Sequence, residues 1–236
     1  MLFQNEEDMS RCENCSIKNL NSFRTYNTDE LCELTQKKNV VSFQKGDLLF
    51  EEGAYLNGIF CLRKGKCKVS KLSPNGKGQI IRFIKQGDLI GERSVLNGST
   101  AHLTVTALED VEACFIPKEE IEAGFRKNTN FSLEITKAIC TDLDNANLAI
   151  ANMAQKNVRE RLADSLLLFD RTFGMDEEGY LNIKLSREEI ANAVGTATES
   201  SIRLLSSMKK EGIIELRGKR IKILDKIKLQ HITEGY

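Results

Sequence analysis

The sequence contains little proline, carries no net charge and has no long hydrophobic run. With two prolines and no Gly/Ser-rich tract, a long flexible linker is excluded, so regular secondary structure should join the domains. No apolar run approaches the roughly 18 residues that a membrane helix needs, and the acidic start NEED is unlike a signal peptide. We therefore expect a cytoplasmic protein with no membrane partner.

Catalytic motifs are missing as well. The 236 residues include no Gly-rich phosphate loop, no HExxH, no G-x-S-x-G and only two histidines, so an enzyme is not expected. The 34 basic residues equal the 34 acidic ones, so binding to a polyanion requires local clustering of positive charge. The seven cysteines are an odd number, which in a reducing compartment favours free thiols or metal ligands over a disulfide framework.

From about Val40 to Pro117 the hydrophobic pattern has period two and is interrupted by turns, which predicts an antiparallel sandwich or barrel. In the last expected strand, alternation places Cys114 on the face opposite Val111 and Ala113, pointing away from the main core. Cys61 and Cys67 flank a turn and are interpreted as structural. The turns are expected at Gly46, Gly65, Gly76 and Gly87.

After Pro117 the period changes to that of a helix. The stripe is long and narrow, which favours the seam of a coiled-coil dimer; packing against the protein's own barrel is the alternative. A second helix should begin near Val158. The stripe consists of Phe131, Ile135, Ile139, Leu143, Ala146, Ile150 and Met153.

The C-terminal third contains LSREEIANAVGTATESSIRLLSSMKKEG. Two capping boxes, Ser186 with Glu189 and Thr196 with Glu199, each predict the start of a short helix, and Gly195 lies in the turn between them. This pattern is typical of a helix-turn-helix. The segment IIELRGKRIKIL then predicts a β-hairpin wing. Residues 201–228 contain nine basic and three acidic side chains, a local charge of plus six that suits phosphate contacts.

A glycine-punctuated barrel, a long helix and a winged helix-turn-helix, in this order, resemble the Crp/Fnr family (cAMP receptor protein and fumarate and nitrate reduction regulator). The resemblance rests on QKGDLLFEEG at 44–53, GDLIGE at 87–92 and LSREEIANAVGTATESSIRLLSSMKKEGII at 185–214, and it covers nearly the whole chain. It implies an α+β fold with an N-terminal antiparallel β-barrel of the jelly-roll, cyclic-nucleotide-binding-like type, a long dimerisation helix and a C-terminal winged helix-turn-helix.

The resemblance also implies a homodimeric transcription factor that binds inverted-repeat double-stranded DNA, acts with RNA polymerase and responds to an effector at the barrel or the N-terminal arm. A cyclic-nucleotide-type regulatory subunit that acts on a protein partner, and a regulator without any small-molecule effector, remain as alternatives. The expected segments are a cysteine-containing arm at 1–30, the effector barrel at 31–128, the dimerisation helix at 129–156 and the DNA-binding domain at 157–236.

Glu199 and Arg203 lie four residues apart near the start of the second helix and match the family's base-reading pair. A glutamate accepts from cytosine and an arginine donates to guanine, so the pair suits a G·C step; a simple i,i+4 ion pair is the alternative. Thr198 replaces an arginine of the cAMP-binding branch, and Ile202 a serine of the oxygen-sensing branch. The expected DNA contacts are Thr196, Thr198, Glu199, Ser200, Arg203, Arg217, Lys219 and Arg220, with Thr196, Thr198, Ser200 and Ser201 either bonding phosphates or capping the helix.

The candidate effector pocket consists of Gly91, Glu92, Ala101 and His102. In the family's cyclic-nucleotide binders, a Gly-Glu pair holds the ribose and an Arg followed by Ser or Thr holds the phosphate. Here Ala101-His102 replaces that Arg-Ser pair, so the guanidinium is missing and cAMP is not expected. His102 suits an anionic ligand, a haem or a purely structural role.

Cys12, Cys15 and Cys114 match three of the four cysteines that hold an iron–sulfur cluster in the oxygen-sensing branch. Asn21 occupies the place of the remaining one, and an amide is a poor iron ligand. Asp8, Glu13 or Cys32 are candidates for the fourth ligand of a redox- or oxygen-sensing cluster. The alternative is a lost cluster, which would leave packing thiols, a reversible disulfide or part of a zinc site.

Overall fold

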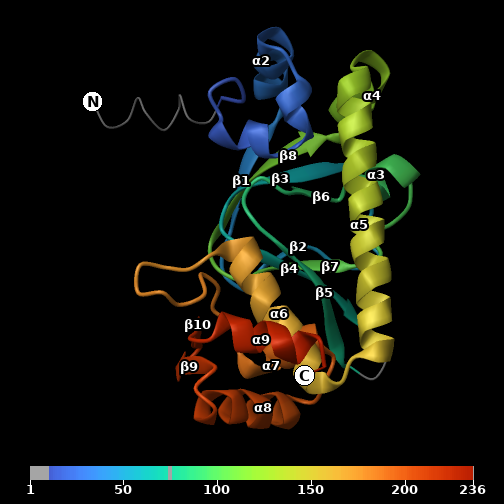
Figure 1. The fold of residues 1–236 in the computed structure, drawn as a ribbon. Coiled ribbons are helices and arrows are strands. Elements are labelled where there is room, and N and C mark those ends of the chain that lie inside the picture. The colour runs from blue at the N-terminus through green and yellow to red at the C-terminus, as the bar shows by residue number, and fades with distance from the viewer. Residues whose placement is uncertain (1–10, 74–75, 236) are drawn as a thin grey trace. The chain divides into compact units, whose positions relative to one another are not determined.

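The computed structural model describes residues 11–73 and 76–235. It has the expected α+β architecture, and the chain divides into two compact units, Met1–Lys71 with Phe83–Asp144 and Leu72–Arg82 with Asn145–Tyr236. Figure 1 shows a sheet-rich part that follows the N-terminal arm, one long helix and a C-terminal group of shorter helices. In the described part of the chain, no helix combines the length and the hydrophobicity that a membrane span requires.

The arm, residues 11–27, contains two short 3₁₀ helices, η1 (Ser16–Leu20) and η2 (Ser22–Thr25). It leads into α2 (Thr28–Lys37), which begins with a capping box between Asn27 and Glu30. Ile17 and Phe23 are buried, so the arm packs into the fold through its own apolar side chains.

The described strands of the barrel form two four-stranded antiparallel sheets, ordered β1-β8-β3-β6 and β2-β7-β4-β5. The predicted jelly-roll type is thereby confirmed. The turn glycines Gly46, Gly65, Gly76 and Gly87 all have positive φ, which side chains with a Cβ rarely adopt. The strands are β1 (Asn39–Phe43), β2 (Leu48–Phe50), β3 (Gly58–Lys64), β4 (Cys67–Leu72), β5 (Gly78–Ile84), β6 (Leu89–Ile90), β7 (Thr104–Ala107) and β8 (Val111–Pro117).

The two faces of the β3–β8 pair contribute to different apolar clusters. The inner face packs into the barrel with Leu62, Val111 and Ala113. The outer face, which carries Cys114 and Ile116, packs against the arm and α2. The predicted orientation of Cys114 is therefore correct, but its thiol is buried in a second core rather than exposed to solvent.

Three helices follow or interrupt the strands: α3 (Glu92–Asn97), α4 (Lys118–Lys127) and α5 (Thr129–Gln155). The apolar stripe of α5 divides into two parts. Phe131 and Ile135 are fully buried in the outer cluster, so the first turns pack against the protein's own core. Leu143 is 60% exposed and Ile150 is 69% exposed, so the later turns present apolar side chains to solvent.

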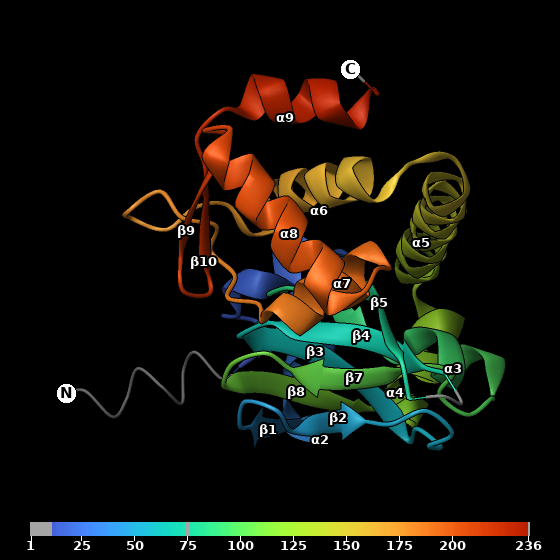
Figure 2. The same ribbon diagram turned by 90° about the horizontal axis from the view of Figure 1, so that it is seen from below.

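The C-terminal unit contains the predicted winged helix-turn-helix (Figure 2). Its helices pack α6 against α7 and α9, and α7 against α8. The hairpin of β9 and β10 turns at Gly218, whose φ is +60°. The elements are α6 (Val158–Phe173), α7 (Arg187–Val194), α8 (Thr198–Lys210), β9 (Ile214–Arg217), β10 (Arg220–Ile223) and α9 (Lys226–Thr233).

One capping box is confirmed and the other is wrong. The side chains and backbones of Ser186 and Glu189 bond reciprocally at the start of α7. At α8 the N-cap is Ala197, and no side chain caps the helix. Thr196 lies one residue too early because its backbone N–H is bonded to the carbonyl of Ala191 and closes the end of α7.

Candidate functional site

The exposed face of α8 carries Glu199 and Arg203, and both side chains reach solvent. Across the described residues the two form no ion pair, although i,i+4 spacing would allow one. Arg203 instead makes a long hydrogen bond from Nη2 to Ser200 Oγ, at 3.3 Å. The carboxylate and most of the guanidinium therefore remain available to an external partner.

The other polar side chains at the start of α8 differ in exposure. Thr196, Thr198 and Ser200 are half-buried. Ser201 is 1% exposed, and its hydroxyl has no hydrogen-bond partner among the described residues. Ser201 thus faces the interior of the unit and is out of reach of a phosphate.

Arg161 of α6 holds the turn between α7 and α8 and was not anticipated from the sequence. Its Nε donates to the carbonyl of Val194 at 2.9 Å, and its Nη2 donates to that of Gly195 at 3.2 Å. These carbonyls belong to the end of α7, which leaves them without helical partners and attracts positive charge. One guanidinium from α6 therefore fixes the turn between α7 and α8.

A second unanticipated contact joins α7 to the wing. Nη2 of Arg187 donates to the carbonyl of Gly218, at 3.0 Å, in the hairpin turn. Arg217 and Lys219, on either side of this glycine, are exposed. The turn is thus tied to the first helix of the motif while its two flanking cations face solvent.

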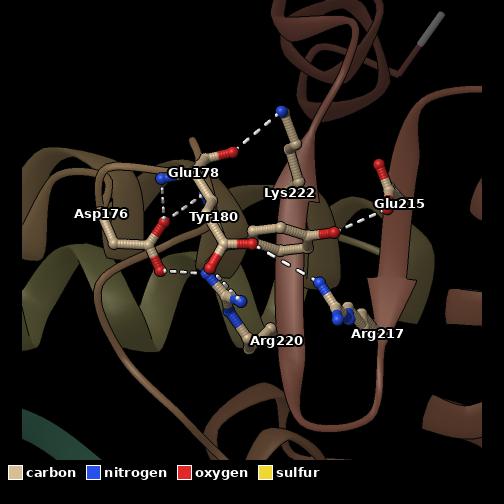
Figure 3. Close-up of polar contacts among 7 residues, drawn as sticks. All are labelled: Asp176, Glu178, Tyr180, Glu215, Arg217, Arg220 and Lys222. Atoms are coloured by element: carbon tan, nitrogen blue, oxygen red, sulfur yellow. Dashed lines mark hydrogen bonds and ion pairs between the residues drawn. The ribbon is translucent and has the colours of Figure 1, made fainter.

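Arg220 is engaged within the unit, and two nearby cations also contact Glu178 (Figure 3): Arg217 Nη1 lies 3.5 Å from its Oε2, and Lys222 Nζ donates to its carbonyl at 3.0 Å. The guanidinium of Arg220 bonds Asp176 Oδ2 at 2.7 Å and Glu178 Oε1 at 2.8 Å. It also lies over the ring of Tyr180, 4.1 Å from the centroid, in a cation–π contact. The phenol of Tyr180 donates to Glu215 of β9 at 2.6 Å. This cluster fastens the wing to the loop before α7.

The cluster also perturbs its acids. The hydrogen bond from Arg220 lowers the pKa of Asp176, and the hydrogen bond to Glu215 raises the pKa of Tyr180. Both shifts favour the protonation states that the contacts require at neutral pH. Arg220 is therefore engaged inside the unit, whereas we had expected it among the phosphate contacts.

The end of α8 is also held by an ion pair. Arg159 of α6 makes two bonds to Glu211, at 2.9 and 2.6 Å. This bidentate contact, with a further bond from Ser207, lowers the pKa of Glu211 to about 2. The pair contributes stability above the usual pKa of a glutamate, and the contribution is lost as pH falls towards 2.

The residues of the candidate effector pocket do not share one environment. Glu92 is 7% exposed at the start of α3, after Gly91 with φ +93°. Ala101 is 2% exposed, and its N–H donates to the carbonyl of Ala54 at 2.8 Å. His102 is exposed. The structure thus buries a methyl group where a phosphate-binding cation would be needed, and it directs the histidine to solvent.

Cys12, Cys15 and Cys114 line one cavity between the arm and the outer face of β3 and β8, with a volume of about 30 Å³. The arm is held there by Asn21, whose amide donates to the carbonyl of Gly87 at 3.0 Å. Cys12 is fixed through its N–H, which donates to Thr35 Oγ1 at 2.8 Å. The three cysteines that the resemblance assigns to one site thus line a single cavity.

The thiols of the cavity are desolvated but lie close to a cation. Burial raises the pKa of Cys12 and of Cys114, while the ammonium group of Lys38 opposes the rise at both. Nζ of Lys38 lies 3.5 Å from the sulfur of Cys114. Within the described residues, no three side chains of His, Cys, Asp or Glu are already arranged around a single metal position.

None of the three residues expected as sources of a fourth ligand is seen to line the cavity. Asp8 lies outside the described residues. Glu13 accepts a hydrogen bond from Thr35, and neither Glu13 nor Cys32 lines the cavity. Cys61, which we had interpreted as structural, does line it. Cys67 alone of that pair lies in the barrel core, because β4 turns its side chain inward.

Comparison with known proteins agrees with this architecture. The cyclic nucleotide-binding domain model matches residues 40–128, and the Crp-like helix-turn-helix domain model matches residues 160–232. The chain belongs to the Crp/Fnr family and is a transcriptional regulator of that type. The helix-turn-helix match excludes the alternative of a regulatory subunit that lacks a DNA-binding domain.

Relatives with different names are similar to this chain to a comparable degree. The fumarate and nitrate reduction regulatory protein of Vibrio cholerae is 29% identical over 230 residues, which cover 94% of this chain and 90% of the relative. The CRP-like cAMP-activated global transcriptional regulator of Mycobacterium tuberculosis is 25% identical over 209 residues, covering 88% and 93%. FixK2 from Bradyrhizobium japonicum shares the fold, with a TM-score of 0.74 and 21% identity over 83% of this chain and 96% of that one.

Proposed function

We propose that the protein acts in the cytoplasm as a homodimer that binds an inverted-repeat DNA site, works with RNA polymerase and responds to redox state or oxygen. The observation that carries the DNA-binding part is the exposed pair of Glu199 and Arg203 near the start of α8. Side chains at this position of a recognition helix reach base edges in the major groove. Their free polar groups match cytosine and guanine.

The wing supplies the phosphate contacts in this proposal. Arg217 and Lys219 are exposed beside the turn at Gly218, and Arg217 makes a long contact with Glu178, at 3.5 Å. Arg220 has a structural role instead, because its ion pairs with Asp176 and Glu178 position the hairpin that carries the other two cations. Phosphate contacts of this kind set the register of the protein on DNA without reading sequence.

The dimer is proposed to form through the second half of α5. Leu143 and Ile150 are seven residues apart, lie on one face of the helix and are exposed. A second copy of the same helix is the occupant that buries both. This contact places two recognition helices in one molecule, as an inverted repeat requires.

Cyclic AMP is expected neither to bind tightly nor to change DNA affinity. The buried methyl group of Ala101 replaces the guanidinium that would bond the cyclic phosphate, and such charge-assisted bonds are among the strongest in a pocket of this kind. Calorimetry at physiological salt checks the binding, and fluorescence anisotropy with labelled DNA checks the switch. Micromolar binding would contradict the expectation and would mean that another cation replaces the missing one.

The thiol cavity is proposed as the sensor. Cys12 and Cys15 belong to the arm and Cys114 belongs to β8, so a change in these thiols alters how the arm packs on the barrel. An iron–sulfur cluster bound by these thiolates would supply a group that oxygen degrades. The protein's own residues hold the arm in place: Asn21 bonds the turn at Gly87, and Lys38 balances thiolate charge.

DNA affinity is expected to differ between protein prepared without oxygen and the same protein exposed to air, by roughly 5–150-fold, the usual range of allosteric coupling. Cys12→Ala should abolish the difference because it removes one thiol of the cavity. Cys32→Ala is the matched control, since Cys32 lies close to the arm but does not line the cavity. Equal affinity of the wild type under both conditions would refute the sensing function.

A further inference from the structure

Cys61 and Cys114 are directly opposite each other on neighbouring antiparallel strands. The register of β3 and β8 pairs Cys61 with Cys114, between the pairs Phe60–Phe115 and Leu62–Ala113. Directly opposed residues have their side chains on the same face, with Cα atoms roughly 4.5–5.5 Å apart. The two thiols therefore leave the sheet side by side, on the outer face.

The same face is covered by the arm, which brings two more thiols. Cys12, Cys15, Cys61 and Cys114 all line the one cavity. Cys61 and Cys114 belong to one buried apolar cluster, and Cys12 and Cys15 pack against that cluster. Four of the chain's seven cysteines thus converge from three separate segments.

The polar groups around the cavity suit thiolates. The amide of Asn21 donates to the sulfur of Cys61 at 3.4 Å, and the ammonium group of Lys38 donates to that of Cys114 at 3.5 Å. Hydrogen bonds to sulfur and nearby cations stabilise the deprotonated form, which is the form that binds metals.

We infer that Cys61 is the fourth thiolate ligand, with Cys12, Cys15 and Cys114, of a metal centre in this cavity; the assignment rests on the proposed sensing function and deepens it. Asn21 stands where the family pattern has a cysteine, but its amide bonds the sulfur of Cys61. Strand β3 thus supplies the metal ligand that the arm lacks, and Asn21 donates a hydrogen bond to that ligand.

Four thiolates select soft metals, as a tetrahedral zinc ion or as an iron–sulfur cluster. On binding, each thiol gives up its proton to solvent and its sulfur donates an electron pair to the metal. The cavity of about 30 Å³ has room for about two water molecules, which suits a single ion. The thiols do not yet surround a single metal position in the structure, so binding of either group requires the segments that carry them to move closer together.

The test compares two reconstitutions of the full-length protein under anaerobic conditions, one with Zn²⁺ alone and one with Fe²⁺ and sulfide. Elemental analysis gives metal and sulfide per chain, and visible absorption identifies a cluster. The wild-type protein is expected to bind metal in one of these two reconstitutions. Cys61→Ser should weaken metal binding by about 100-fold or more. Removing a ligand should lower metal affinity more than removing a group that only hydrogen-bonds a ligand, which costs roughly 10–100-fold.

Cys67→Ser is the matched control. Cys67 lies at the start of β4, in the other sheet, and is buried in the barrel core, so it tests loss of a buried thiol without loss of a ligand. Full metal content in Cys61→Ser would overturn the assignment, as would a wild type that binds neither metal or that only forms a disulfide between Cys61 and Cys114. Circular dichroism shows whether each variant folds.

A measurement on the unaltered chain removes any dependence on the folding of variants. Metal-loaded protein is alkylated, and the labelled cysteines are identified by mass spectrometry. Protection of Cys12, Cys15, Cys61 and Cys114 together, with Cys32 and Cys140 labelled, supports the assignment; labelling of Cys61 in loaded protein overturns it. If the four thiols bind metal but DNA affinity is the same with and without the metal, the proposed sensing function is wrong while the ligand assignment stands.

Discussion

Replacing Leu143 and Ile150 together with glutamate is expected to convert the protein into a folded monomer with strongly reduced DNA affinity. Both side chains are exposed in the single chain, so glutamate is tolerated there and favours the helix. In the proposed dimer the same positions face their symmetry mates, where burial of unpaired carboxylates is unfavourable. Loss of the second recognition helix should lower affinity for an inverted repeat by roughly 10²–10⁴-fold.

Light scattering measures the mass, and anisotropy measures the DNA affinity. Leu148→Glu is the matched control, since Leu148 is 60% exposed on the same helix but lies on the opposite side from Leu143 and Ile150. The control should remain dimeric. A double variant that is still a dimer would show that the subunits associate through another surface.

Selection from randomised DNA is expected to recover an inverted repeat with half-sites about one helical turn apart, and Arg203→Ala should relax one G·C pair in each half-site. The exposed guanidinium of Arg203 is held only by a long bond to Ser200, so it is available to guanine O6 and N7. Its loss should cost roughly 1–3 kcal/mol for each half-site. The selected motif and the affinity for the wild-type site are the two measurements.

Two variants with the same change in charge separate base reading from phosphate binding. Lys219→Ala, at the exposed turn of the wing, should weaken all sequences alike and reduce the salt slope by about one. Lys209→Ala, at the far end of α8, should have little effect on the motif. If the motif selected by Arg203→Ala equals that of the wild type, Arg203 does not read the base.

The sequence predicted those features that depend on neighbouring residues. Strand alternation placed Cys114 opposite Val111 and Ala113, and the glycine turns delimited the barrel strands. The helix period predicted the stripe of α5. Which of its residues are buried depends on how far the outer cluster extends along the helix. The capping signal of Ser186 was correct because its partner lies three residues away.

Features that depend on long-range register could not be predicted in this way. Cys61 meets Cys114 only because β3 and β8 align at that residue, and nothing within either strand specifies the alignment. Arg220 follows the turn of a basic hairpin, so its charge suggested a phosphate contact; the acids that engage it, Asp176 and Glu178, lie more than 40 residues away.

Three of the arginines in the C-terminal unit affect the spacing of DNA half-sites. Arg161 fixes the turn after α7, Arg187 ties α7 to the wing, and Arg220 fastens the wing to the preceding loop. Each winged helix-turn-helix is therefore ordered before it binds DNA, and it cannot change its shape to reach a displaced half-site. One inserted base pair rotates the second half-site by about 35° around the DNA axis. Bending of the DNA or of the long helices must compensate for that rotation. Because the recognition unit is rigid, the length of the spacer becomes a second determinant of which DNA sites are bound.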